Sequence, residues 1–120
     1  MLSKTNTIDG VKYTVNAENG WHVLKKRQFY NRVYKADDPE WDAWYEYGRA
    51  LVQSSDVETP FLWPDVTDTY EELKAARDKW LALPAGVIRA WLDDLDAVNA
   101  APVDPSLKPD ANPKNVESQQ

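Results

Sequence analysis

The strongest constraint on the fold is a stripe of apolar residues that repeats at helical spacing from Trp41 to Val52. Positions i, i+3, i+4, i+7, i+10 and i+11 of this segment are apolar or glycine, which is the pattern of a buried helix face. Because glycine inside a helix costs about 1 kcal/mol relative to alanine, Gly48 predicts the close approach of another ring or backbone. The stripe consists of Trp41, Trp44, Tyr45, Gly48, Leu51 and Val52.

Three other segments carry stripes of the same kind and predict three more helices. They cover about 21–35, about 69–83 and about 85–99. With the first stripe, they predict four helices in all. The stripes are Val23, Phe29, Tyr30, Val33 and Tyr34; then Tyr70, Leu73, Arg77, Trp80 and Leu81; then Val87, Ile88, Trp91, Leu92, Leu95 and Val98.

Capping-box spacings predict where two of the helices begin. Asp37 and Glu40 are three residues apart around Pro39, which is tolerated in a first helical turn. We therefore expect the helix that carries Gly48 to start within this segment. Asp68 and Glu71 have the same spacing and predict the start of the third helix.

The N-terminal segment Thr5–Val15 predicts a β-hairpin. Asp9 and Gly10 suit a two-residue turn with positive φ angles. Because an isolated hairpin is marginally stable in water, we expect its apolar face to lie on a helix or to pair with another chain. That face consists of Val11, Tyr13 and Val15.

The remaining segments predict irregular structure. Pro60 and Pro64 interrupt residues 54–66, so we expect an irregular connector there. Prolines among polar residues in 101–120 predict a flexible tail. The predicted fold is therefore mainly α: one four-helix domain in 1–100 with a short N-terminal β-hairpin, followed by a disordered Pro-rich C-terminal tail in 101–120.

The composition argues against an enzyme. The chain has no cysteine and a single histidine, His22. A Cys-His pair therefore cannot form, and a Ser-His-Asp arrangement would depend on His22 alone. His22 is expected to be a surface residue at a helix start. The four glycines are isolated, so no phosphate-binding loop is formed. We predict no catalytic residue, no metal site and no cofactor.

Charge is distributed unevenly along the chain. Residues 1–37 carry seven Lys/Arg against three Asp/Glu, whereas residues 38–100 carry five against fourteen. The acidic remainder argues against nucleic-acid binding. No apolar stretch approaches the roughly 18 residues that a membrane helix needs, and none resembles a signal peptide. We therefore expect a cytoplasmic protein without membrane contact. The densest basic group is Lys25, Lys26 and Arg27, and we predict that it contacts a protein partner.

Aromatic residues are the main candidates for contact with a partner. Six Trp, six Tyr and two Phe occur among 120 residues. Trp63 and Phe61 lie off any helical stripe, between two prolines, so they either fill the core or contact a partner protein. Four other tryptophans lie on stripes and are expected in the core: Trp41, Trp44, Trp80 and Trp91.

Acidic side chains near the end of the last predicted helix suggest a second contact. Asp93 and Asp96 share one helix face, close to a helix C-terminus where the dipole disfavours anions. A solvated face explains them most simply. As a hypothesis, they face a cationic surface, either helix 21–35 of a second copy or a separate partner.

The order of elements resembles the tail assembly chaperones of long-tailed bacteriophages. The resemblance rests on the hairpin TIDGVKYTV at 7–15, the aromatic helical body, the segment WLALPAGVIRAWLDDLDAVN at 80–99 and the Pro-rich end. It implies a protein without enzymatic parts that acts in the host cytoplasm during virion assembly. Such a chaperone binds the tape-measure protein and keeps it soluble until the tail-tube protein polymerises around it.

Two other kinds of function remain open from the sequence. The acidic segment 38–100 is also typical of a phage-encoded inhibitor that mimics nucleic-acid phosphate and blocks a host DNA-binding or defence protein. A permanent structural or adaptor subunit of a virion is the third possibility.

Overall fold

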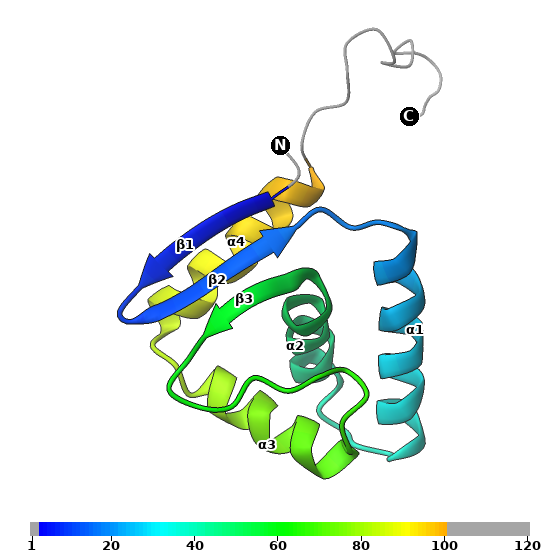
Figure 1. Ribbon diagram of the computed structural model, residues 1–120. Coiled ribbons are helices and arrows are strands. Elements are labelled where there is room, and N and C mark those ends of the chain that lie inside the picture. Colours follow the sequence, from blue (N-terminus) through cyan, green and yellow to red (C-terminus); the bar gives the residue numbers. More distant parts are fainter. Residues whose placement is uncertain (1–2, 101–120) are drawn as a thin grey trace, which may run out of the picture.

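The computed structural model describes residues 3–100 (Figure 1). The three strands form an antiparallel sheet in the order β1-β2-β3, and α4 lies along it. Helix α2 lies between α1, α3 and α4 and so forms the centre of the helical part. The elements are β1 (Ser3–Ile8), β2 (Val11–Asn16), α1 (Gly20–Lys35), α2 (Trp41–Gln53), β3 (Ser54–Glu58), α3 (Tyr70–Leu81) and α4 (Ala85–Asn99).

The predicted hairpin is confirmed. Ile8 pairs with Val11 across a two-residue turn, and Asp9 and Gly10 adopt φ angles of 50° and 80°. Positive φ at both central positions is the geometry that fits the right-handed twist of a hairpin. The alternating apolar face of β2 is buried against α4, so it lies on a helix of the same chain. Its members are Val11, Tyr13 and Val15.

Strand β3 corrects the prediction of an irregular connector over 54–66. It follows α2 without a gap and pairs with β2 through Val15 with Ser54 and Thr14 with Ser55. The register then shifts before Lys12 pairs with Glu58. The strand has the polar sequence SSDVE and is mostly exposed, so no alternation of apolar residues marks it. Hydrogen bonds to β2 of the hairpin define this strand, although its own sequence has no apolar alternation.

Two of the predicted helix starts are shifted: α3 begins one residue later than predicted, and α2 begins directly after the predicted segment. Helix α3 is capped by Thr69 and Glu72, which form a capping box, and not by Asp68 and Glu71. Helix α2 begins at Trp41, and the expected box of Asp37 with Glu40 does not form because Asp37 adopts a left-handed φ of 57°. The bounds of α1 and α4 agree with the prediction to within a residue.

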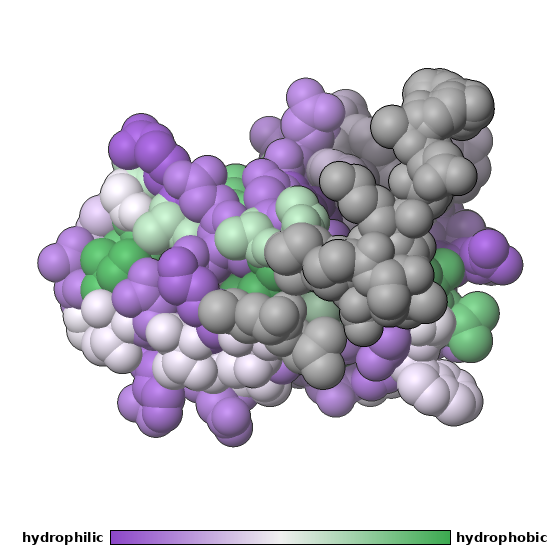
Figure 2. Space-filling view, turned by 90° about the horizontal axis from the view of Figure 1, so that it is seen from above, coloured by the Kyte–Doolittle hydropathy of each residue, from purple (hydrophilic) through white to green (hydrophobic). Residues whose placement is uncertain are grey.

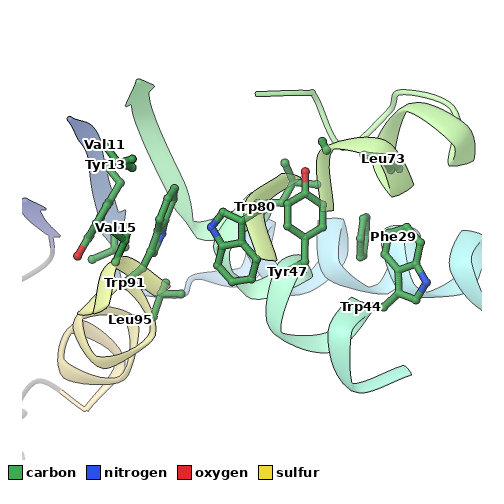
Figure 3. Close-up of a cluster of buried hydrophobic side chains, with 14 of the residues drawn as sticks. Val11, Tyr13, Val15, Phe29, Trp44, Tyr47, Leu73, Trp80, Trp91 and Leu95 are labelled. Carbon is green, nitrogen blue, oxygen red and sulfur yellow. The ribbon is translucent and has the colours of Figure 1, made fainter. Parts of the chain in front are cut away.

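Aromatic rings connect the sheet to the far end of the helices through the core (Figure 3). Tyr13 on β2 stacks on Trp91 of α4, with ring centroids 4.4 Å apart. Trp91 contacts Trp80 at a centroid separation of 5.8 Å, and Trp80 contacts Tyr47 at 5.6 Å. Tyr47 then contacts Trp44 at 6.5 Å, and Trp44 contacts Phe29 at 5.7 Å. Three of the four tryptophans expected in the core are fully buried there, whereas Trp41 is 41% exposed.

Gly48 lies where the sequence predicted a close approach. A β-carbon at this position would be 2.7 Å from Cε1 of Tyr30 and 2.9 Å from Cε2 of Phe29. Both distances are shorter than van der Waals contact, so only glycine admits these rings. Gly48 therefore allows α1 and α2 to pack tightly.

Helix α1 buries a narrower face than predicted. Phe29 and Val33 are fully buried, but Val23 is 44% and Tyr34 78% exposed. Within 3–100, no helix is long and apolar enough to cross a membrane. The predicted flexible tail, 101–120, lies outside the described residues.

Candidate functional site

Trp63 and Phe61 pack against the core. The indole of Trp63 stacks on Trp91, with centroids 5.2 Å apart and planes at 23°, and meets the edge of Tyr47 at 5.7 Å. Phe61 in turn contacts Trp63. Both are half-buried. The structure therefore gives Trp63 a packing role, and contact with a partner remains a prediction for both residues.

The connector that carries these rings is tied to α1 by one side chain. Nη1 of Arg32 donates hydrogen bonds of 2.7 Å to the backbone carbonyls of Val66 and Asp68. These bonds explain how a segment with two prolines keeps a defined path over the core. They also give Arg32 a structural function that its charge alone did not reveal.

The acidic residues of α4 have different environments. Asp93 is exposed, whereas Asp96 forms an ion pair with Arg49 of α2. Between them, Asp94 is buried, and its Oδ1 accepts a 2.7 Å hydrogen bond from Nζ of Lys4. Cations within residues 3–100 therefore offset two of the three acids near this helix end, and the hypothesis of a cationic partner retains only Asp93 as an exposed acid without an ion pair there.

Asp94 links the hairpin to α4. Its Oδ2 accepts hydrogen bonds from the hydroxyl of Tyr13 at 2.7 Å and from Nδ2 of Asn6 at 3.2 Å. Burial alone would raise the pKa of Asp94, but the bonds from Lys4, Tyr13 and Asn6 outweigh it and lower the pKa. Burial and the bond to Asp94 raise the pKa of Tyr13. The group stays an ionised, fully bonded carboxylate.

The basic residues of α1 do not act as one group. Lys25 and Arg27 are exposed, but Lys26 is directed toward the body of the protein. Its Nζ lies 2.9 Å from Oε2 of Glu18 and also donates to Oε1 of Gln53. The two remaining cations stay predicted partner contacts.

His22 has a structural function. Its Nδ1 accepts a hydrogen bond from the backbone N–H of Asn19, whose side chain accepts one from the backbone of His22. Burial, followed by the charges of Lys25 and Lys26, lowers the pKa of His22. The side chain is thus part of the capping box of α1. Among residues 3–100, no three His, Cys, Asp or Glu side chains gather into a possible metal site.

A surface that the sequence did not single out lies where α1 ends and α2 begins, at the lower right of Figure 1. Three large rings are exposed there: Tyr34 by 78%, Trp41 by 41% and Tyr45 by 49%. The ring of Tyr30 lies between α1 and α2, 5.7 Å from Trp41 and 6.1 Å from Tyr45. We call Tyr30, Tyr34, Trp41 and Tyr45 the α1–α2 aromatic face.

The core fixes the position of this face. The hydroxyl of Tyr30 donates a 2.9 Å hydrogen bond to the backbone carbonyl of Tyr45. Its ring fits over Gly48, which leaves no room for a β-carbon. The exposed rings of Trp41 and Tyr45 therefore pack against the half-buried, hydrogen-bonded ring of Tyr30.

Part of the aromatic face borders an open hollow of about 400 Å³. Tyr34 and Trp41 form its aromatic sides, and the turn residues Asp37, Asp38 and Pro39 complete it. Of the two acids, Asp37 is exposed, whereas the side chain of Asp38 is buried and only 5% exposed.

Helix α3 anchors the acidic side of the hollow. The hydroxyl of Tyr70 donates a 2.6 Å bond to Oδ2 of Asp38, and the backbone N–H of Glu40 donates to Oδ1 at 2.9 Å. These two bonds lower the pKa of Asp38 to about 2. The buried Arg77 binds Glu40 at 2.8 Å through Nη2 and lies over the ring of Trp44. The turn before α2 is thus held in place.

A second hollow, of about 410 Å³, lies where α3 passes into α4. It is mainly aliphatic, with one cation at its border, and contains no aromatic ring. Seen from above in Figure 2, the described surface is mainly hydrophilic, with apolar groups in small separate areas. The residues of the second hollow are Leu81, Leu83, Ala85, Ile88, Arg89 and Leu92.

The chain matches no protein-family model, no curated protein and no solved structure. The resemblance to tail assembly chaperones therefore remains a prediction from the sequence.

Proposed function

We propose that the chain is a non-enzymatic protein-binding domain and that the α1–α2 aromatic face is its contact surface. The observation that carries this proposal is that Trp41 and Tyr45 are exposed while packed on Tyr30, with Tyr34 exposed beside Trp41 at the hollow. Rigid aromatic side chains lose little conformational entropy on binding and bury a large area, which is why they dominate binding hot spots.

The partner we propose is the tape-measure protein of a long-tailed bacteriophage. This part of the proposal rests on the sequence resemblance. A tape-measure protein is long and helical, and it needs its apolar surface covered before the tail tube forms. An exposed aromatic face suits the temporary binding of such segments, because aromatic contacts tolerate variation in the client sequence.

Co-expression tests the proposal. The reading frames beside the gene should include one for a long helical protein, and its product should become soluble when the chain is co-expressed. The variant Tyr34→Ala/Trp41→Ala/Tyr45→Ala should leave the client insoluble. Trp21→Ala is the matched control, because Trp21 is 74% exposed on α1 but lies outside the aromatic face. Equal rescue by all three proteins would overturn the proposed surface, and the absence of such a frame would remove the chaperone role.

The two other functions predict different results. An acidic inhibitor of a DNA-binding or defence protein should bind a basic protein, and its affinity should fall steeply with salt. A structural or adaptor subunit should remain in purified particles. A chaperone should be absent from particles, and its affinity should fall far less with salt than that of an acidic inhibitor.

A further inference from the structure

We propose that the hollow between α1 and α2 binds the guanidinium group of an arginine side chain of the partner protein. This inference rests on the proposed function and names the chemistry that the contact surface recognises. The hollow is bordered by Tyr34 and Trp41 together with Asp37, Asp38 and Pro39. Two exposed rings beside the exposed carboxylate of Asp37 are the combination that a planar cation favours.

The aromatic sides supply the first attraction. The faces of Trp and Tyr rings carry negative charge density and attract cations within about 6 Å of the ring centre. Trp41 packs against Tyr30, and Tyr34 lies on the last turn of α1. A guanidinium group is weakly hydrated and stacks on such rings, whereas the ammonium of lysine is a compact, strongly hydrated charge. The hollow therefore favours arginine.

Charge supplies the second attraction. The segment 36–48 contains five acidic residues and no Lys or Arg. Within residues 3–100, Arg77 binds two of these acids and Arg49 binds a third, which leaves Asp37 and Asp42 without an ion pair. Asp37 lines the hollow. A cation there meets the carboxylate of Asp37, which forms no ion pair within residues 3–100.

The shape of the hollow agrees with this occupant. Its volume of about 400 Å³ is that of a small binding pocket, which suits one long side chain and the backbone on either side of it. The turn that carries Asp37 and Asp38 is anchored to α3 through Tyr70 and Arg77, so the acidic side stays in place before binding. Lys35 is exposed next to Tyr34 in the sequence, but it does not line the hollow.

An NMR titration tests the proposal without the partner. The probe is N-acetyl-arginine N-methylamide, and the neutral control is N-acetyl-citrulline N-methylamide, which has nearly the same shape. The indole N–H signal of Trp41, identified by its loss in Trp41→Leu, should shift with the arginine probe and approach saturation. The affinity for the citrulline probe should be lower by a factor of about five or more, because this probe lacks the charge. The signal of Trp21 in the same spectra should not move.

Two charge variants sharpen the test. Asp37→Asn should weaken binding of the arginine probe about three-fold, because the carboxylate that lines the hollow is removed. Asparagine tolerates the left-handed φ of 57° at this position, so the backbone is not strained. Asp56→Asn is the matched control, since it changes the net charge equally at an exposed site outside the hollow that also has a left-handed φ, of 51°. It should leave the affinity unchanged.

Three results would overturn the arginine site: equal binding of the arginine and citrulline probes, no shift at Trp41, or an equal effect of Asp37→Asn and Asp56→Asn. If the client still depends on Tyr34, Trp41 and Tyr45, the proposed function stands without it. Saturable, charge-dependent binding of the probe together with failed rescue of the client would keep the site and overturn the proposed function.

Discussion

The hydroxyl of Tyr13 donates a 2.7 Å hydrogen bond to Oδ2 of Asp94 and so joins the central strand to the last helix inside the protein. Lys4 and Asn6 of the edge strand bind the same carboxylate. Three side chains of the hairpin thus converge on one buried acid of α4. The sheet is attached to the helical part by polar contacts as well as by the stacking of Tyr13 on Trp91.

The first prediction concerns the substitution Asp94→Asn. It removes the charge that pairs with Lys4. This charge is buried, because the side chain of Asp94 is only 8% exposed. Breaking a buried, charge-assisted network should lower the free energy of unfolding by about 2 kcal/mol. Asp93→Asn changes an exposed neighbour and should stay within about 0.5 kcal/mol of the wild type. Urea unfolding at pH 7 measures both, and equal values would contradict the assigned network.

The second prediction concerns acid stability. The pKa of Asp38 is lowered to about 2 in the folded protein, first by the hydrogen bond from Tyr70. An unfolded Asp has a pKa of about 3.9. Because the folded pKa is the lower one, the stability that Asp38 contributes is complete above about pH 4 and is lost as the pH falls toward about 2.

The variant Asp38→Asn tests this pH dependence. The difference in unfolding free energy between the wild type and Asp38→Asn should be largest near pH 6 and should shrink between about pH 4 and pH 2. The pKa of Asp94 is lowered as well, so the wild type should also lose stability from Asp94 as the pH falls. A difference at Asp38 that stays constant over this range would show that its carboxylate has an ordinary pKa.

The periodic elements were predictable from the sequence, and the non-periodic one was not. Helix α4 and the hairpin followed from spacing and from the turn at Asp9 and Gly10. Strand β3 was missed because its polar residues give no alternation, and only pairing with β2 makes it a strand. Periodicity measures how much of a face is apolar, so it cannot find a strand that is formed mainly by backbone hydrogen bonds.

The candidate site was missed because stripes do not tell which part of a face a neighbour covers. Trp41 lies on the stripe of α2, but it is the first residue of that helix. One available signal was the spacing of four within both Tyr30/Tyr34 and Trp41/Tyr45, which places an aromatic pair on each side of a short turn. A comparable signal existed for Asp94, which lies seven residues after Val87 on the buried stripe of α4.

The third prediction concerns Trp63. Its ring stacks on Trp91 and meets Tyr47, so Trp63→Leu should lower the free energy of unfolding by about 1 to 2 kcal/mol. Leu62 is 86% exposed in the same connector, and Leu62→Ala should change stability by less than about 0.5 kcal/mol. If Trp63→Leu were as stable as Leu62→Ala but impaired binding of the client, Trp63 would be a partner contact and not part of the core.

The fourth prediction concerns the substitution Gly48→Ala. Alanine favours a helix by about 1 kcal/mol over glycine, but its β-carbon would lie 2.7 Å from Tyr30 and 2.9 Å from Phe29. Phe29 is fully buried in the core, and Tyr30 is held by its bond to Tyr45, so neither ring moves freely. Overpacking costs about 1 to 3 kcal/mol, and we expect a net loss of about 1 kcal/mol.

Gly86→Ala provides the opposite expectation within the same fold. Within residues 3–100, a β-carbon built at Gly86 has no atom within 4 Å apart from its own residue, its chain neighbours and the backbone of its own helix, and Gly86 is exposed in the first turn of α4. The substitution should therefore leave stability unchanged or raise it by up to about 0.5 kcal/mol. Urea unfolding gives both values, and the indole signal of Trp41 should shift only in Gly48→Ala, because displacement of Tyr30 moves the ring that supports it. A stabilised Gly48→Ala protein with an unmoved Trp41 signal would mean that α1 and α2 pack less closely than the structure shows.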